Sequence, residues 1–161
     1  MNAISPDPDL DLVLERVVDV PPHLVWMAWT QPEHLKPWFA PKPVETTECE
    51  IDLRPGGKFR TVMKLPDGQV FDGTGCYLEV VENERLVWTT ALGPGYRPHA
   101  ATDLDMPFTA VLTLTPEGDG TRFRALAIHA DPEAAKRHDE MGFTDGWGTA
   151  LQQLVDYVKA L

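Results

Sequence analysis

The residue in this sequence best suited to chemistry is His129, at the end of a β-prone stretch. Strand alternation predicts that its imidazole shares a face with Phe123, Ala125 and Ala127. Because a histidine changes charge near neutral pH, one imidazole on that face could orient a ligand or move a proton. No serine or cysteine nucleophile stands beside it in the sequence, so a structural or solvent-facing role is the simpler interpretation.

The other histidines form no recognisable metal-binding motif. His138 and Asp139 could join the first imidazole across the start of the following helix, if the fold brings them together. His23, His34 and His99 show no spacing of the HExxH kind. We therefore predict neither a metal site nor another cofactor.

Two further features with possible chemistry have simple structural interpretations. Cys49 and Cys76 are the only cysteines, too few for a disulfide framework and without CxxC spacing. We expect both to be reduced thiols in the core. Residues 54–57 (RPGG) lack the GK[ST] of a phosphate loop and lie between two predicted strands. They predict a turn.

Size and charge restrict the partners of the chain. A length of 161 residues with 43% hydrophobic residues fits one domain with one core, which we place at residues 10–161 after a disordered lead-in at residues 1–9. The formal charge of −11 disfavours nucleic acids and anionic membranes as partners. No apolar run is long enough to cross a bilayer, and the polar start is unlike an export signal. We expect a cytoplasmic protein, either a monomer or a weak homodimer.

The order of the predicted elements indicates an α+β fold. A strand at residues 10–20 is followed by two short helices at residues 23–30 and 33–39. Short turns separate the next strands, so we expect them to pair as an antiparallel meander. These six strands are predicted at residues 44–53, 58–65, 69–81, 85–92, 107–115 and 121–129.

The last predicted element is a single long helix that begins near Asp131. Its apolar side chains Trp147, Leu151, Leu154 and Val158 share one face. The fold is therefore predicted as β-α-α-β6-α, with a curved antiparallel sheet wrapped around this helix. The stretch 93–106 is long for a hairpin loop and could line or cover a site.

Small residues predict a space inside this arrangement. Ala125 and Ala127 occupy consecutive inward positions, and the start of the long helix carries Gly142, Gly146 and Gly148. Protein interiors are close-packed, so such a gap is either filled by neighbouring aromatic rings or left open for a ligand.

Several motifs in a fixed order resemble those of a known family, the Hsp90-ATPase-activator-like branch of the START-like superfamily. The resemblance covers residues 10–160 and implies the helix-grip fold together with a possible ligand cavity. Members of this group vary in function, so the fold does not define the activity. The matching motifs are residues 16–30 (RVVDVPPHLVWMAWT), 32–39 (PEHLKPWF), 51–57 (IDLRPGG), 75–79 (GCYLE), 84–88 (ERLVW) and 141–147 (MGFTDGW).

Our leading functional hypothesis is a non-catalytic module that holds an apolar or amphipathic small molecule between the sheet and the C-terminal helix. The residues that we expect to line the site are Phe59, Thr61, Met63, Trp88, Leu112, Phe123, Ala125, Ala127, His129, Met141, Phe143 and Trp147.

Two alternatives come from other functional classes. The first is a cyclase or hydrolase that uses His129 as acid or base, as the superfamily permits. The second is a co-chaperone that stimulates the Hsp90 ATPase, as the family name suggests. Length weakens the second, because about nine residues precede the first predicted strand, whereas the eukaryotic activator carries an additional N-terminal domain.

Overall fold

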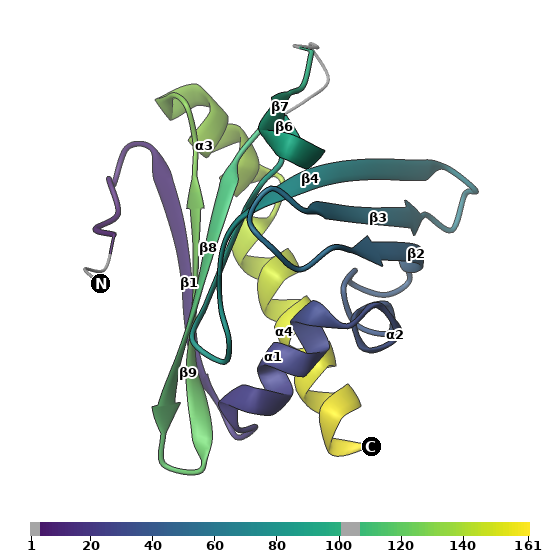
Figure 1. Ribbon diagram of the computed structural model, residues 1–161, viewed down its shortest axis with the longest axis vertical. Helices are drawn as coiled ribbons and strands as arrows, with labels where there is room; N and C mark the ends of the chain where they lie inside the picture. Colours follow the sequence, from purple (N-terminus) through teal and green to yellow (C-terminus); the bar gives the residue numbers. More distant parts are fainter. Residues whose placement is uncertain (1–3, 101–106) are drawn as a thin grey trace.

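Seven antiparallel strands form the main sheet of the computed structural model, which describes residues 4–100 and 107–161 (Figure 1). The strand order is β1-β9-β8-β5-β4-β3-β2. A separate two-stranded sheet, β6 with β7, flanks the short 3₁₀ helix η1. The strand bounds are β1 (Asp11–Val18), β2 (Glu45–Ile51), β3 (Lys58–Lys64), β4 (Val70–Val81), β5 (Arg85–Thr89), β6 (Leu92–Gly93), β7 (Arg97–Pro98), β8 (Thr109–Glu117) and β9 (Gly120–Ile128), and η1 spans Pro94–Tyr96.

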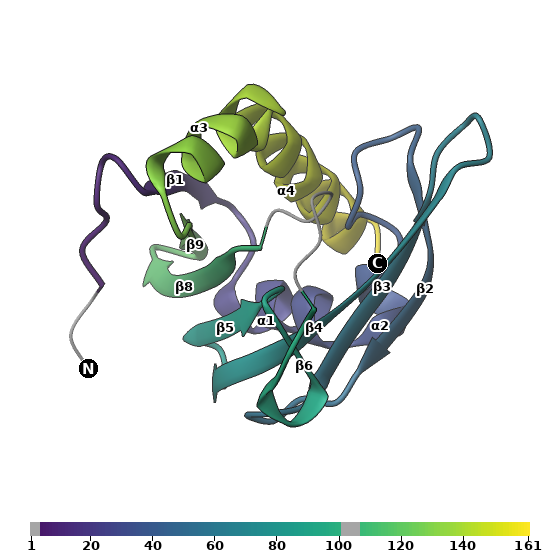
Figure 2. The same cartoon turned by 90° about the horizontal axis from the view of Figure 1, so that it is seen from above.

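The sheet curves around the C-terminal helix α4 (Phe143–Lys159), as the view from above shows (Figure 2). Leu151, Leu154 and Val158 of this helix are buried, because its apolar stripe covers the concave face of the sheet. Two short helices, α1 (Pro22–Thr30) and α2 (Pro32–Leu35), follow β1. The predicted α+β helix-grip fold is confirmed.

The region predicted as one helix after Asp131 contains two helices, α3 (Pro132–Glu140) and α4. Asp131 caps α3, because its Oδ1 accepts a hydrogen bond of 2.8 Å from the backbone N–H of Ala134. Gly142 separates the helices with a φ of +95°, a left-handed conformation that glycine adopts without steric cost. The apolar periodicity was visible in the sequence, but this break was not predicted.

Other bounds also differ from those predicted. The second short helix was expected at residues 33–39 but α2 ends at Leu35, and the strand expected at residues 85–92 ends at Thr89. Residues 1–3 of the predicted lead-in and residues 101–106 of the stretch 93–106 lie outside the described residues. The described part of that stretch contains β6, η1 and β7. No helix in the described part of the chain is long and apolar enough to span a membrane.

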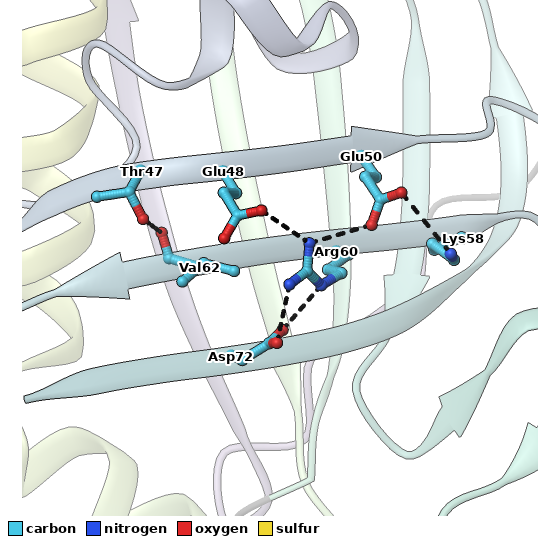
Figure 3. Close-up of polar contacts among 7 residues, drawn as sticks. All are labelled: Thr47, Glu48, Glu50, Lys58, Arg60, Val62 and Asp72. Atoms are coloured by element: carbon cyan, nitrogen blue, oxygen red, sulfur yellow. Dashed lines mark hydrogen bonds and ion pairs between the residues drawn. The ribbon is translucent and has the colours of Figure 1, made fainter.

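An ionic network ties β2, β3 and β4 together on one face of the sheet (Figure 3). Arg60 of β3 donates to Asp72 of β4 through Nε (3.0 Å) and Nη2 (2.9 Å), and to Glu50 of β2 through Nη1 (3.1 Å). Glu48 and Lys58 extend the network through ion pairs of 3.6 Å and 3.9 Å. Because side chains alternate along a strand, this network lies opposite the face that carries Phe59 and Thr61.

Candidate functional site

A cavity of about 600 Å³ lies between the concave face of β3, β4 and β5 and the ring of Trp147 on α4. We call it the aromatic cavity. Three other surface hollows are each lined by several charged side chains, whereas this one has a mainly apolar wall. The described residues that line it are Phe39, Phe59, Thr61, Met63, Asp72, Gly73, Thr74, Gly75, Trp88, Thr90, His99, Ala100, Pro107, Phe108 and Trp147.

Two glycines on β4 line the cavity and have different roles. In the β3–β4 register, Gly73 is opposite Thr61 and Gly75 is opposite Phe59, so both glycines fall on the concave face. A Cβ atom at Gly75 would lie only 2.7 Å from the backbone oxygen of Thr89, whereas a Cβ at Gly73 would meet nothing within 4 Å. Gly75 therefore permits close strand packing, and Gly73 leaves open volume.

Aromatic rings form most of the cavity wall. Phe59 and Trp88 meet edge to face, with centroids 5.2 Å apart and planes at 86°. Trp88 and Trp147 are nearly parallel at 8°, with centroids 6.2 Å apart. Phe108 meets Trp147 at 70° and 6.4 Å, and Phe39 meets Phe59 at 76° and 5.9 Å. The rings that line the cavity therefore differ in orientation.

The polar groups of the cavity lie near β4 and the end of β5. His99 Nε2 lies 2.8 Å from the backbone oxygen of Thr74 and donates to it. The backbone N–H of Phe108 donates to Thr90 Oγ1 at 3.0 Å, and this bond positions the Phe108 ring. The carboxylate of Asp72 is turned to the opposite face of the sheet, where it pairs with Arg60. The cavity therefore has an aromatic wall and a smaller polar side.

His129 and His138 form a buried pair outside this cavity. His129 Nδ1 lies 2.8 Å from the backbone oxygen of Leu10, and its Nε2 lies 2.8 Å from His138 Nδ1. Burial, followed by the neighbouring His129, lowers the pKa of His138 to about 4. Both nitrogens of His129 are therefore bonded inside the protein. This geometry argues against the acid–base role considered for it, although His138 does join it as the sequence suggested.

Of the twelve residues predicted to line a site, His129 belongs to the buried pair, and the other eleven lie in the cavity, in the core or at the surface. Phe59, Thr61, Met63, Trp88 and Trp147 line the aromatic cavity. Leu112, Phe123, Ala125 and Ala127 are 1–2% exposed within the closed core. Phe143, which is 2% exposed, packs against Trp147 and His138 at 5.3 Å and 5.2 Å between ring centroids. Met141 is 71% exposed.

No open space borders Ala125 and Ala127, because both are 1% exposed and belong to the closed core. Phe108 packs near the histidine pair, 4.9 Å from the His138 ring and 6.2 Å from the His129 ring, measured between centroids. The open volume lies beside β4 instead, where Gly73 and Gly75 alternate in the sequence.

Sequence reasoning missed several lining residues, above all Phe39, Gly73, His99 and Phe108. The alternating glycines at positions 73 and 75 were an available signal, since two missing side chains on one strand face leave volume. His99 lies within the stretch 93–106, which was expected to line or cover a site, and Phe108 follows shortly after it. Nothing in the sequence indicates that Phe39, after α2, reaches the same cavity.

Thiol chemistry is not favoured at either cysteine. Burial raises the pKa of Cys49 to about 11, which keeps its thiol protonated at neutral pH. Cys76 is fully buried. Within residues 4–100 and 107–161, no group of three or more histidine, cysteine, aspartate or glutamate residues is placed to hold a metal ion.

Comparisons with solved structures support the fold along nearly the whole chain. A crystal structure of a protein from Nitrosomonas europaea is 48% identical, with a TM-score of 0.91, and the match covers 96% of this chain and 97% of that one. A protein from Mycobacterium smegmatis is 27% identical over 92% and 90% of the two chains, with a TM-score of 0.76. An NMR structure titled as an AHSA1-like protein from Aeromonas hydrophila shares the fold at 24% identity, with a TM-score of 0.71 over 94% and 93% of the chains.

A search of the curated proteins finds no match. Residues 19–159, however, match the family described as "Activator of Hsp90 ATPase homolog 1-like protein". This match includes both short helices, every strand from β2 to β9 and the whole of α4. The chain therefore belongs to the family of Activator of Hsp90 ATPase homolog 1-like proteins.

Proposed function

We propose that this protein binds an apolar or amphipathic small molecule in the aromatic cavity. The observation that carries the proposal is the cavity whose lining combines open space at Gly73 with the rings of Phe59, Trp88 and Trp147. Small-molecule sites are typically apolar hollows of roughly 300–1,000 Å³ with a few polar groups on one side, and a cavity of about 600 Å³ fits this range.

The polar side of the cavity favours binding over catalysis. Among the described lining residues, the ionisable side chains are Asp72 and His99. Asp72 pairs with Arg60, and His99 donates to the backbone oxygen of Thr74. Neither forms the nucleophile–base pair that covalent hydrolysis requires. We therefore propose a carrier or sensor of a small molecule.

Substitution of Gly73 tests this proposal directly. Because a side chain at this position enters open space on the concave face, Gly73→Trp should fill the cavity without displacing the core. Val70→Trp is the matched control, because Val70 lies on the same strand, is 55% exposed and is not among the lining residues.

Two measurements follow. Small molecules that co-purify with the natively isolated protein are identified by mass spectrometry, and binding of the neutral dye Nile red is followed by fluorescence. Gly73→Trp should lose the co-purifying molecules and most of the dye binding, while Val70→Trp should retain both. Equal binding by the two variants would exclude the aromatic cavity as the site.

The family description favours a second candidate, stimulation of the Hsp90 ATPase. The observation behind it is the family match alone, so we rank it below small-molecule binding. An ATPase assay with purified Hsp90 decides it: an increased hydrolysis rate on addition of the protein supports this activity, and an unchanged rate at saturating concentration excludes it.

A further inference from the structure

The wall of the aromatic cavity is suited to a positive charge. Five rings, those of Phe39, Phe59, Trp88, Phe108 and Trp147, contribute to the lining. The face of an aromatic ring carries partial negative charge, and a cation within about 6 Å of the ring centroid is attracted to it. Since neighbouring rings meet at 70–86°, a compact cation in the cavity could face several rings at once.

The charges around the cavity also favour a cation. The described lining residues include no lysine or arginine, so nothing among them could pair with an anionic ligand except His99. On the other face of the same strands, three carboxylates (Glu48, Glu50 and Asp72) surround two cations (Arg60 and Lys58), as Figure 3 shows. This network carries one net negative charge on the opposite face of the sheet, and the whole chain carries −11. Such a field raises the local concentration of cations.

The polar groups of the cavity are suited to the rest of an amphipathic ligand. The described contacts use only the Nε2 atom of His99, which donates to the Thr74 oxygen, so its Nδ1 can accept a hydrogen bond when the ring is neutral. Thr61 faces the same space from β3. A ligand with a carbonyl or hydroxyl group near its cationic end could therefore use both the rings and these side chains.

From these observations we infer that the aromatic cavity takes an organic cation, a quaternary ammonium or protonated amine attached to an apolar group. This inference rests on the proposed small-molecule function and narrows its ligand class. It assigns the specificity to the ring faces of Trp88, Phe108 and Trp147 rather than to a charged side chain.

Two probes of matched shape test the inference. Benzoylcholine carries a trimethylammonium group, and 3,3-dimethylbutyl benzoate places a neutral carbon at the position of its nitrogen. Dissociation constants for both are measured by NMR titration of the protein's amide signals. We expect the cation to bind about fivefold or more tightly than the neutral ester. Its N-methyl protons should shift upfield, because ring currents shield groups that lie above aromatic faces.

Variants locate the effect within the cavity. Phe108→Leu and Trp147→Leu should each weaken binding of benzoylcholine by about threefold or more, with a smaller loss for the neutral ester. Two positions are used in case one variant folds poorly. Phe71→Leu is the control, because Phe71 is 48% exposed, lies on β4 and is not among the lining residues. It should leave both dissociation constants unchanged.

The outcomes distinguish a failure of the cation inference from a failure of the proposed small-molecule binding. Equal affinities for the two probes, both abolished by Gly73→Trp, would overturn the preference for a cation and leave small-molecule binding intact. If Gly73→Trp changes the binding of neither probe, or if neither binds the wild-type protein, the cation inference fails. Nile red and the co-purifying molecules then decide separately whether the cavity binds a ligand.

Discussion

His129 and His138 are hydrogen-bonded to each other in the interior, and they are only 5% and 9% exposed. The partners define the tautomers. His129 Nδ1 faces the Leu10 carbonyl and must donate, so the Nε2 of a neutral His129 accepts from the Nδ1–H of His138. The pair joins the region before β1 to the end of β9 and to α3. It connects these three segments in the interior.

The first prediction concerns the pH dependence of stability. His138 has a pKa of about 4 in the folded protein, below its ordinary value of 6.5, because burial disfavours the charged ring. Between these values the unfolded chain binds a proton that the folded chain does not. Stability is therefore complete above pH 6.5 and falls as the pH decreases toward 4, by roughly 2–4 kcal/mol in total. Urea unfolding at pH 7.5 and pH 4.5 measures the difference.

Two variants isolate the contribution of His138. His138→Gln keeps a side chain that can donate a hydrogen bond but does not titrate, so it should show a smaller loss of stability between the two pH values. His23→Gln alters an exposed histidine and should retain the wild-type pH dependence. If His138→Gln and wild type lose equal stability on acidification, the buried pair does not cause the loss.

The second prediction distinguishes glycines by their backbone conformation. Gly146 and Gly148 lie inside α4, and an added Cβ would meet nothing within 4 Å at either position. Glycine is a poor helix former, so Gly146→Ala and Gly148→Ala should each stabilise the protein by about 0.5–1 kcal/mol. Gly142 has a left-handed φ of +95°, and Gly142→Ala should destabilise it by about 1 kcal/mol. Thermal unfolding of the three variants measures these changes. If all three substitutions shifted the unfolding temperature in the same direction, backbone conformation would not distinguish these glycines.

Most of the fold could be predicted because its signals are local. Pro21 caps and Pro22 begins α1 after β1, short polar turns separate the strands, and apolar spacing marks α4. The break between α3 and α4 was missed because Gly142 is one of several glycines near the start of α4. Only Gly142 adopts a positive φ among Gly142, Gly146 and Gly148, and composition does not reveal which glycine will.

The location of the cavity was harder to predict, because it depends on how the strands pair and on which aromatic side chains point into the interior. Ala125 and Ala127 were expected to border an open space, but both are 1% exposed within the closed core. Phe108 owes its position to the hydrogen bond between its backbone and Thr90, a contact between residues far apart in the sequence. Volume inside a core is decided by such tertiary contacts, and residue size alone does not determine it.

The third prediction tests the network around Arg60. Its guanidinium forms two hydrogen bonds with Asp72, and the neighbouring carboxylates raise the pKa of Arg60, so it stays charged. A double-mutant cycle of Arg60→Ala and Asp72→Ala, measured by thermal unfolding, should show favourable coupling at low salt. The coupling should decrease at 1 M NaCl, because salt screens exposed charges. The pair Lys136–Glu140 on α3, which is 3.9 Å apart and more exposed, should show weaker coupling under both conditions.

The fourth prediction concerns Gln153, whose side chain holds the connection between α2 and β2. Its Nε2 donates to the backbone oxygens of Trp38 (3.0 Å) and Ala40 (2.8 Å), and its Oε1 accepts from the Lys42 N–H at 2.9 Å. Gln153→Leu removes all three bonds and leaves two partly buried carbonyls without this donor. The cost should be about 1–3 kcal/mol of stability.

Gln152 provides the matched control for this substitution. It is exposed, and its side chain contacts Asp156 on the same helix, so Gln152→Leu should change stability by less than about 0.5 kcal/mol. Hydrogen exchange gives a second readout, since the Lys42 amide should exchange faster in Gln153→Leu and at the wild-type rate in Gln152→Leu. Because Phe39 lies between the two carbonyls that Gln153 holds and also lines the aromatic cavity, Gln153→Leu should weaken Nile red binding as well. Unchanged exchange at Lys42 would show that the connection is fixed by packing rather than by this amide.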